Sequence, residues 1–96
     1  MSLIESATLM HYAVEKRDKS TLLQATIHEL LQTDDSGDTL LHYAVANNDL
    51  EITKLLFYKC PALLNMVDKT GKTALYWAKE DKFTEVIAFL KKSAQK

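Results

Sequence analysis

The chain has 96 residues, of which 47% are hydrophobic and 26% are charged, and its formal net charge is −1. This length fits a single domain, and a charge so close to zero gives no general attraction to nucleic acid or to anionic membranes. The sequence has no apolar run near the ~20 residues that span a bilayer and no secretory signal pattern, so we expect a soluble cytoplasmic protein.

A capping pattern stands at the start of the chain, where Ser2 precedes Glu5 by three residues. This spacing predicts a helix that begins early, because the two side chains can each bond a backbone N–H group at the helix start. The first copy of a recurring motif follows at residues 8–14, TLMHYAV. Its Thr8 is a second candidate for the helix cap. The leucine pair at 22–23 marks a second helix downstream.

The middle copy of the motif lies at residues 39–45, TLLHYAV, 31 residues after the first. A turn precedes it, because Asp34 can open a tight reversal and Gly37 can adopt a positive φ. Thr39 stands where it would cap the next helix. Apolar residues at helical spacing over 52–56 predict a second helix in this copy.

The last copy is looser and lies at residues 73–79, TALYWAK, 34 residues after the middle copy. Asp68 and Gly71 precede it as Asp34 and Gly37 precede the middle copy, and apolar residues at helical spacing follow over 83–90. The unit is therefore turn, helix, turn, helix. One such unit cannot bury its apolar face alone, so the copies must stack, and about three are needed for stability.

These motifs make the sequence similar to the ankyrin repeat family over essentially the whole chain. The hairpin aspartate and glycine match twice, and the family's Thr-Pro-Leu-His motif is matched well at 39–42, fairly at 8–11 and partly at 73–76. The resemblance implies an all-α solenoid of helix-turn-helix units joined by β-hairpin-like turns. It predicts one domain, 1–96, with repeats at about 4–33, 34–67 and 68–96, the first and last being atypical capping repeats.

The resemblance also assigns structural residues. The family's motif histidine braces the helix start and the adjoining turn, a role that falls to His11 and His42, whereas Tyr76 stands in its place in the last copy. Asn48 and Lys82 occupy the usual glycine of the turn between helices. The expected structural residues are Thr8, His11, Asp34, Gly37, Thr39, His42, Asp68, Gly71 and Thr73.

The sequence offers little that points to catalysis. One cysteine, Cys60, and three scattered histidines cannot form a Cys/His metal cluster, and two isolated glycines cannot form a phosphate-binding loop. We therefore expect a protein that is not an enzyme and that holds no metal and no cofactor. A catalytic pair brought together by the fold is an alternative that sequence reasoning leaves open.

Aromatic residues recur in register just after the histidine or its substitute, at Tyr12, Tyr43 and Trp77. Such a column could be a stacking platform for a peptide or a base. We favour the alternative that the rings fill the gaps between repeats with their polar edges exposed. Trp77, in the last copy, is the strongest exception.

Charge is distributed unevenly along the chain. Residues 1–33, 34–67 and 68–96 carry net charges of −1, −3 and +3. The first hairpin is acidic and the second is mainly basic, an arrangement that would orient a partner more than tighten its binding. In the ankyrin family, partners bind hairpin tips and the concave side of the first helices. The candidate contacts are therefore Asp35, Ser36, Asp38, Asn47, Lys69, Thr70, Lys72, Trp77 and Glu80.

The resemblance implies a non-catalytic module, an adaptor, scaffold or inhibitor, that binds a protein partner and neither nucleic acid nor membrane. A first alternative is a targeting or regulatory N-terminal domain of a larger enzyme or effector, in which case delivery into a host cell is a further possibility. An alternative of another class is an enzyme or small-ligand binder with a groove near Trp77 and Tyr43. We expect a monomer, although an exposed apolar end of the last copy could drive self-association.

Overall fold

The chain forms three stacked pairs of helices in a computed structural model that describes the backbone of residues 3–94 and the side chains of residues 9–94. The elements are α1 (Leu3–Glu15), α2 (Lys19–Gln24), α3 (Ile27–Leu30), α4 (Leu40–Ala46), α5 (Leu50–Lys59), the 3-10 helix η1 (Pro61–Asn65), α6 (Ala74–Glu80) and α7 (Thr84–Ala94). No residue within 3–94 lies in a strand. The predicted all-α repeat fold is confirmed.

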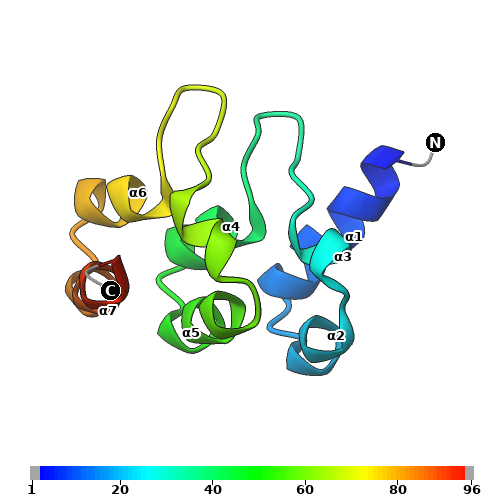
Figure 1. Cartoon of the computed structure of the whole chain (residues 1–96), viewed down its shortest axis with the longest axis horizontal. Helices are drawn as coiled ribbons and strands as arrows, with labels where there is room; N and C mark the ends of the chain where they lie inside the picture. The colour runs from blue at the N-terminus through cyan, green and yellow to red at the C-terminus, as the bar shows by residue number, and fades with distance from the viewer. Residues whose placement is uncertain (1–2, 95–96) are drawn as a thin grey trace.

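The pairs line up along the longest axis of the molecule, which measures 37 Å. Figure 1 shows α1, α4 and α6, here called the inner helices, in one row, and α2, α5 and α7, the outer helices, in a second row below them. Two loops project on the opposite side from the outer helices. These loops contain the first hairpin, residues 34–38, and the second hairpin, residues 68–72.

The core runs without interruption through all three helix pairs. Ala13, Ala44 and Ala78 occupy the same position in successive inner helices and are buried, so that these helices can approach one another closely. Leucine, isoleucine and valine side chains from both rows fill the space around them. Cys60 is 2% exposed and belongs to this core. Each repeat therefore completes its core with side chains from its neighbours.

Two of the motif threonines cap helices. The hydroxyl oxygens of Thr39 and Thr73 each accept a 3.2 Å hydrogen bond, from the backbone N–H groups of His42 and Tyr76 respectively. The prediction that Thr8 caps a helix is wrong, because α1 already begins at Leu3 and Thr8 lies inside it. No Asp-x-x-Gly turn precedes Thr8 to interrupt the helix.

The early start of α1 was predicted from the pattern at Ser2, and α1 does begin at Leu3. Ser2 itself lies outside the described residues, so the capping box at this end stays a prediction.

A short helical turn follows the outer helix in the first two repeats, and sequence reasoning missed both turns as elements. In the first repeat it is α3, which begins at a capping box in which Thr26 and Glu29 bond each other's backbone N–H groups. In the second it is η1, with Pro61 at its first position. Leu30 and Leu63, one in each turn, are fully buried and belong to the core.

The turn between the two main helices of each repeat has a left-handed residue. Arg17, Asn48 and Lys82 have φ values of 56°, 53° and 60°. In each case the next residue donates its N–H to the carbonyl five positions back, as in Phe83 to Ala78 at 3.1 Å, which is a Schellman ending. Glycine adopts this conformation freely, whereas a residue with a Cβ is strained.

We expect Lys82→Gly to be more stable than Lys82→Ala by about 1 kcal/mol, because only glycine relieves the strain of positive φ while both variants lose the same side chain. Urea denaturation followed by circular dichroism measures the difference. Equal stabilities would contradict a left-handed turn at this position.

Candidate functional site

The first hairpin is organised by one carboxylate. Oδ1 of Asp34 accepts hydrogen bonds from the backbone N–H groups of Ser36 and Asp38, both at 2.9 Å, and Gly37 closes the turn with φ 79°. Burial alone would raise the pKa of Asp34, but hydrogen bonds from the Tyr43 hydroxyl and from these two amides outweigh it and lower the pKa. The ionised carboxylate therefore holds the loop in shape.

The second hairpin repeats this construction with an additional donor. Oδ1 of Asp68 accepts the backbone N–H of Thr70 at 2.9 Å, the backbone N–H of Lys72 at 3.0 Å and the Thr70 hydroxyl at 2.6 Å. The hydroxyl bond first, and then the Lys72 amide, lower the pKa of Asp68 to about 2. Gly71 has φ 83° at the matching position.

The two hairpins lie against each other. The backbone N–H of Lys69 donates to the carbonyl of Ser36 at 3.0 Å. A Cβ on Gly37 would come within 3.0 Å of the Lys69 nitrogen and 3.2 Å of its Cγ, whereas a Cβ on Gly71 would meet nothing within 4 Å. Gly37 is therefore needed both for its backbone conformation and for the close approach of the next hairpin.

Buried histidines bond the first two inner helices, α1 and α4, to the hairpin that follows each of them. Nδ1 of His42 accepts the backbone N–H of Thr39 at 3.1 Å, and Nε2 lies 2.8 Å from the carbonyl oxygen of Lys72. An amide can only donate and a carbonyl can only accept, so this ring is the neutral tautomer with its proton on Nε2. Nε2 of His11 makes the equivalent 2.9 Å bond to the carbonyl of Asp38.

The ring of Tyr43 fills the space between the first and second repeats. It packs edge-to-face on His11, with centroids 4.3 Å apart, and its hydroxyl donates to Oδ2 of Asp34 at 2.7 Å. Burial, and then this bond to an anion, raise the pKa of Tyr43 above its usual range. The polar edge of the ring is thus bound to the hairpin, whereas we had expected it to be exposed.

Trp77 takes the same place between the second and third repeats. Its ring packs edge-to-face on His42 with centroids 4.9 Å apart, and its Nε1 donates to Oδ2 of Asp68 at 3.2 Å. Of the three aromatic residues in this register, Tyr12 is the most open, at 56% exposed. The aromatic column is therefore mainly a set of contacts between repeats, and Trp77 is half-buried in it.

The predicted contact residues fall into two groups. The tip residues Asp35, Ser36, Lys69 and Thr70 are exposed and are brought together by the bond between the hairpins. Asn47 and Glu80 are also exposed but lie apart from them, Asn47 as the C-cap of α4 and Glu80 as the last residue of α6.

Asp38 and Lys72 stand at the base of the hairpins and are only half exposed. The Lys72 ammonium lies 5.0 Å from the centroid of the Tyr76 ring, where it makes a cation–π contact. Oδ1 of Asp38 is buried and accepts no hydrogen bond from any described residue. Burial, and then repulsion from Asp34, raise the pKa of Asp38.

Two grooves lie along the inner helices, one next to the first hairpin and one toward the C-terminal ends of α1 and α4. One has a volume of about 200 Å³ and the other about 460 Å³. The smaller is lined by His11, Tyr12, Glu15, Asp34 and Tyr43, and the larger by Glu15, Arg17, Asn47, Asn48, Asp49 and Leu50. Both are lined by Glu15, so they are neighbours along α1 and α4, and together they are here called the track. Of the two aromatic residues named for the alternative small-ligand site, Tyr43 lines the smaller groove and Trp77 lines neither.

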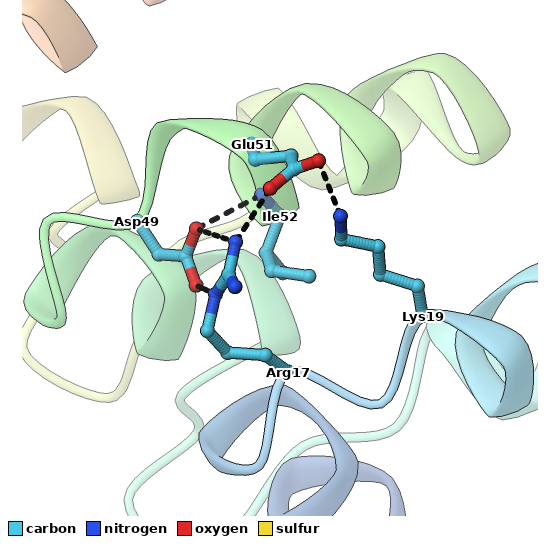
Figure 2. Close-up of polar contacts among 5 residues, drawn as sticks. All are labelled: Arg17, Lys19, Asp49, Glu51 and Ile52. Carbon is cyan, nitrogen blue, oxygen red and sulfur yellow. Dashed lines mark hydrogen bonds and ion pairs between the residues drawn. The ribbon is translucent and has the colours of Figure 1, made fainter.

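An ion-pair network joins the first two repeats at the end of this track (Figure 2). The Arg17 guanidinium bonds the carboxylates of Asp49 at 2.7 Å and Glu51 at 2.6 Å, and Lys19 pairs with the other oxygen of Glu51. Hydrogen bonds from Lys19, and then from Arg17, lower the pKa of Glu51. Asp49 also accepts the backbone N–H of Ile52 and so caps α5. Apart from Asp49, the side chains of the network are largely exposed, so the network sets geometry more than it adds stability.

The chemistry available at this surface is that of recognition. Within the described part of the chain, no three His, Cys, Asp or Glu side chains are grouped so that they could bind a metal ion. None of the helices in that part is long and apolar enough to cross a membrane. What the surface does provide is a pair of oppositely charged loop tips beside this track.

Comparisons with known proteins agree with the repeat pattern. A family model for ankyrin repeats, in three copies, matches residues 5–96. The chain is also 40% identical over 57 residues to the protein named leucine-rich repeat serine/threonine-protein kinase 1 of Caenorhabditis elegans. Those residues are 59% of this chain but only 2% of that relative, so the likeness concerns a small segment of a much longer protein.

Replacing the two hairpin glycines with alanine should give unequal losses of stability. We expect Gly71→Ala to lower the free energy of unfolding by about 1 kcal/mol, through backbone strain alone, and Gly37→Ala by about 2–3 kcal/mol, because the new Cβ also presses on Lys69. Chemical denaturation of both variants measures this. Equal losses would mean that the hairpins do not pack together.

The stability of the fold should depend on pH through Asp68. Its pKa is about 2 in the folded chain against an ordinary 3.8, so its stabilising effect is complete above about pH 4 and is lost as the pH falls toward 2. The free energy of unfolding of the native chain should therefore drop faster over this range than that of Asp68→Asn. Urea denaturation of both proteins at a series of pH values tests this. If their free energies of unfolding fell in parallel, Asp68 would not be the cause of the pH dependence.

Proposed function

The chain belongs to the ankyrin repeat family, and from that premise we propose that it is a non-catalytic module, an adaptor, scaffold or inhibitor, that binds a protein partner through its hairpin tips and inner helices. The observation that carries the proposal is the backbone hydrogen bond between Ser36 and Lys69. It places an acidic tip directly beside a basic one and fixes the distance between them.

This juxtaposition favours a partner that carries the opposite pair of charges. The exposed carboxylate of Asp35 would face a basic group and the exposed ammonium of Lys69 an acidic one. Charges arranged in this way select the orientation of the partner and speed its association, even when each pair adds little affinity. Three repeats offer a small surface, of the order of the ~800 Å² per partner in a standard interface, so we expect moderate affinity.

Asp38, which is half exposed at the base of the first hairpin, would contribute a further carboxylate to this contact. Lys72, Asn47, Thr70 and Glu80 would then form the edges of the contact. Trp77 would contribute only the part of its ring that the neighbouring repeat leaves uncovered.

A second role for the same surface is as a targeting or regulatory part of a longer protein. The likeness to a segment of a large kinase supports it, because a module of this kind is found there within a much longer chain. A small-ligand site has weaker support, since the groove at Tyr43, at about 200 Å³, is smaller than the ~300–1,000 Å³ of most ligand pockets.

We place the protein in the cytoplasm as a monomer, where a free, buried Cys60 would stay reduced.

Affinity capture from cell lysate with mass spectrometry tests the proposal. We expect proteins retained by the native chain to be lost from the double variant Asp35→Lys with Lys69→Glu, which leaves the net charge unchanged. The matched control is Glu85→Lys with Lys91→Glu, which exchanges two exposed charges on α7, far from the hairpins (Figure 1).

The control should retain what the native chain retains. If the hairpin variant, folded by circular dichroism, held the same proteins as the native chain, the tips would not be the binding surface. If the control lost them as well, the effect would not be specific to the tips.

A further inference from the structure

Three aromatic rings gather on the outer helices α5 and α7. Figure 1 shows these two helices on the side of the stack away from the hairpins. Phe57 and Tyr58 come from α5 and Phe89 from α7. The ring centroids lie 5.5, 5.7 and 5.9 Å apart, with every pair edge-on. This is the geometry that aromatic rings prefer when they form a common apolar surface.

The rings form part of a groove between α5 and α7 with a volume of about 430 Å³. It is lined by Lys54, Phe57, Tyr58, Phe89, Lys92 and Ser93. Both charged residues in this lining are lysines, and the Lys54 ammonium lies 5.7 Å from the centroid of the Phe89 ring. The groove is therefore apolar at its base and positively charged at its edges.

Packing between repeats explains only part of this cluster. Phe57 and Phe89 are half-buried, and Phe89 packs against the core, but Tyr58 is 69% exposed. Neither Lys54 nor Lys92 forms an ion pair with a described residue, in contrast to Arg17 and Lys19. Exposed apolar surface that packing does not explain marks an interaction site, and here it lies beside two lysines that form no ion pair within the described chain.

We propose that this groove is a second docking surface and that its occupant is a short acidic segment of another protein. The segment inserts one large apolar side chain among Phe57, Tyr58 and Phe89 and sets carboxylates against Lys54 and Lys92. The volume of the groove falls within the ~300–1,000 Å³ of small binding pockets, so it accepts a side chain and not a whole helix. Charge complementarity selects an acidic sequence over a neutral one.

A membrane surface fits the groove less well. Recognition of anionic lipid uses clusters of about 4–8 basic residues, whereas only two lysines line this site.

Selection of short random peptides displayed on phage against the intact chain tests the proposal. We expect enriched peptides to combine Asp or Glu with one Phe, Trp or Leu. In fluorescence anisotropy, the best peptide should bind about tenfold more weakly to Lys54→Glu with Lys92→Glu, and also to Tyr58→Ala. These three side chains are exposed or at the groove edge, so the variants should fold, as circular dichroism would verify.

Two matched controls make the test specific to this groove. Lys79→Glu with Lys91→Glu makes the same change in charge at exposed positions that do not line the groove, and it should leave the peptide affinity unchanged. The hairpin variant Asp35→Lys with Lys69→Glu should also bind the peptide with native affinity. A failure of this groove proposal can therefore be distinguished from a failure of the proposed hairpin surface.

Several outcomes would overturn the proposal. They are the absence of any enriched peptide, the enrichment of neutral or basic peptides, and equal weakening by the control lysine pair. Binding of the native chain to phosphatidylserine vesicles, with no enriched acidic peptide, would likewise show that the groove has a different ligand.

Discussion

The hydrogen bond from a buried histidine to the next hairpin is the interaction on which the rest of this structure depends. His42 uses both ring nitrogens, one for the start of its own helix and one for the Lys72 carbonyl in the following repeat. A buried carbonyl without a partner costs free energy, so this bond fixes the position of the second hairpin relative to α4. The aromatic contacts and the pairing of the hairpin tips follow from that position.

Much of this fold could be predicted from the sequence, because repetition turns weak local signals into a strong one. The register of threonine, histidine and glycine identified the helix pairs and their turns. Where a helix begins is harder to predict, since it depends on what precedes it, and Thr8 was misassigned for that reason. The short helix α3 had a readable signal in Thr26 and Glu29. The left-handed conformation of Arg17 could be predicted only from its register, six residues after His11 as Asn48 is after His42.

The binding surfaces were less predictable, because they arise between repeats. The sequence marked the two hairpins as charged loops, but it did not show that Ser36 and Lys69, 33 positions apart in the chain, are joined by a backbone hydrogen bond. The groove of Phe57 and Phe89 was not predicted at all. From the sequence, a phenylalanine in an outer helix is predicted to be a core residue. Helical spacing does not show which part of its ring stays exposed after the neighbouring repeat has packed against it.

The contacts between main helices link each pair to the next, α1 to α4 and α4 to α6 in one row, α2 to α5 and α5 to α7 in the other. Partners in contact are thus separated by about one repeat of chain, and the entropy lost on closing such short loops is small. A chain built in this way can nucleate at its best-formed repeat and add the others outward. It can also open from either end while the middle pair stays folded, so that the two terminal pairs should exchange their amide hydrogens soonest.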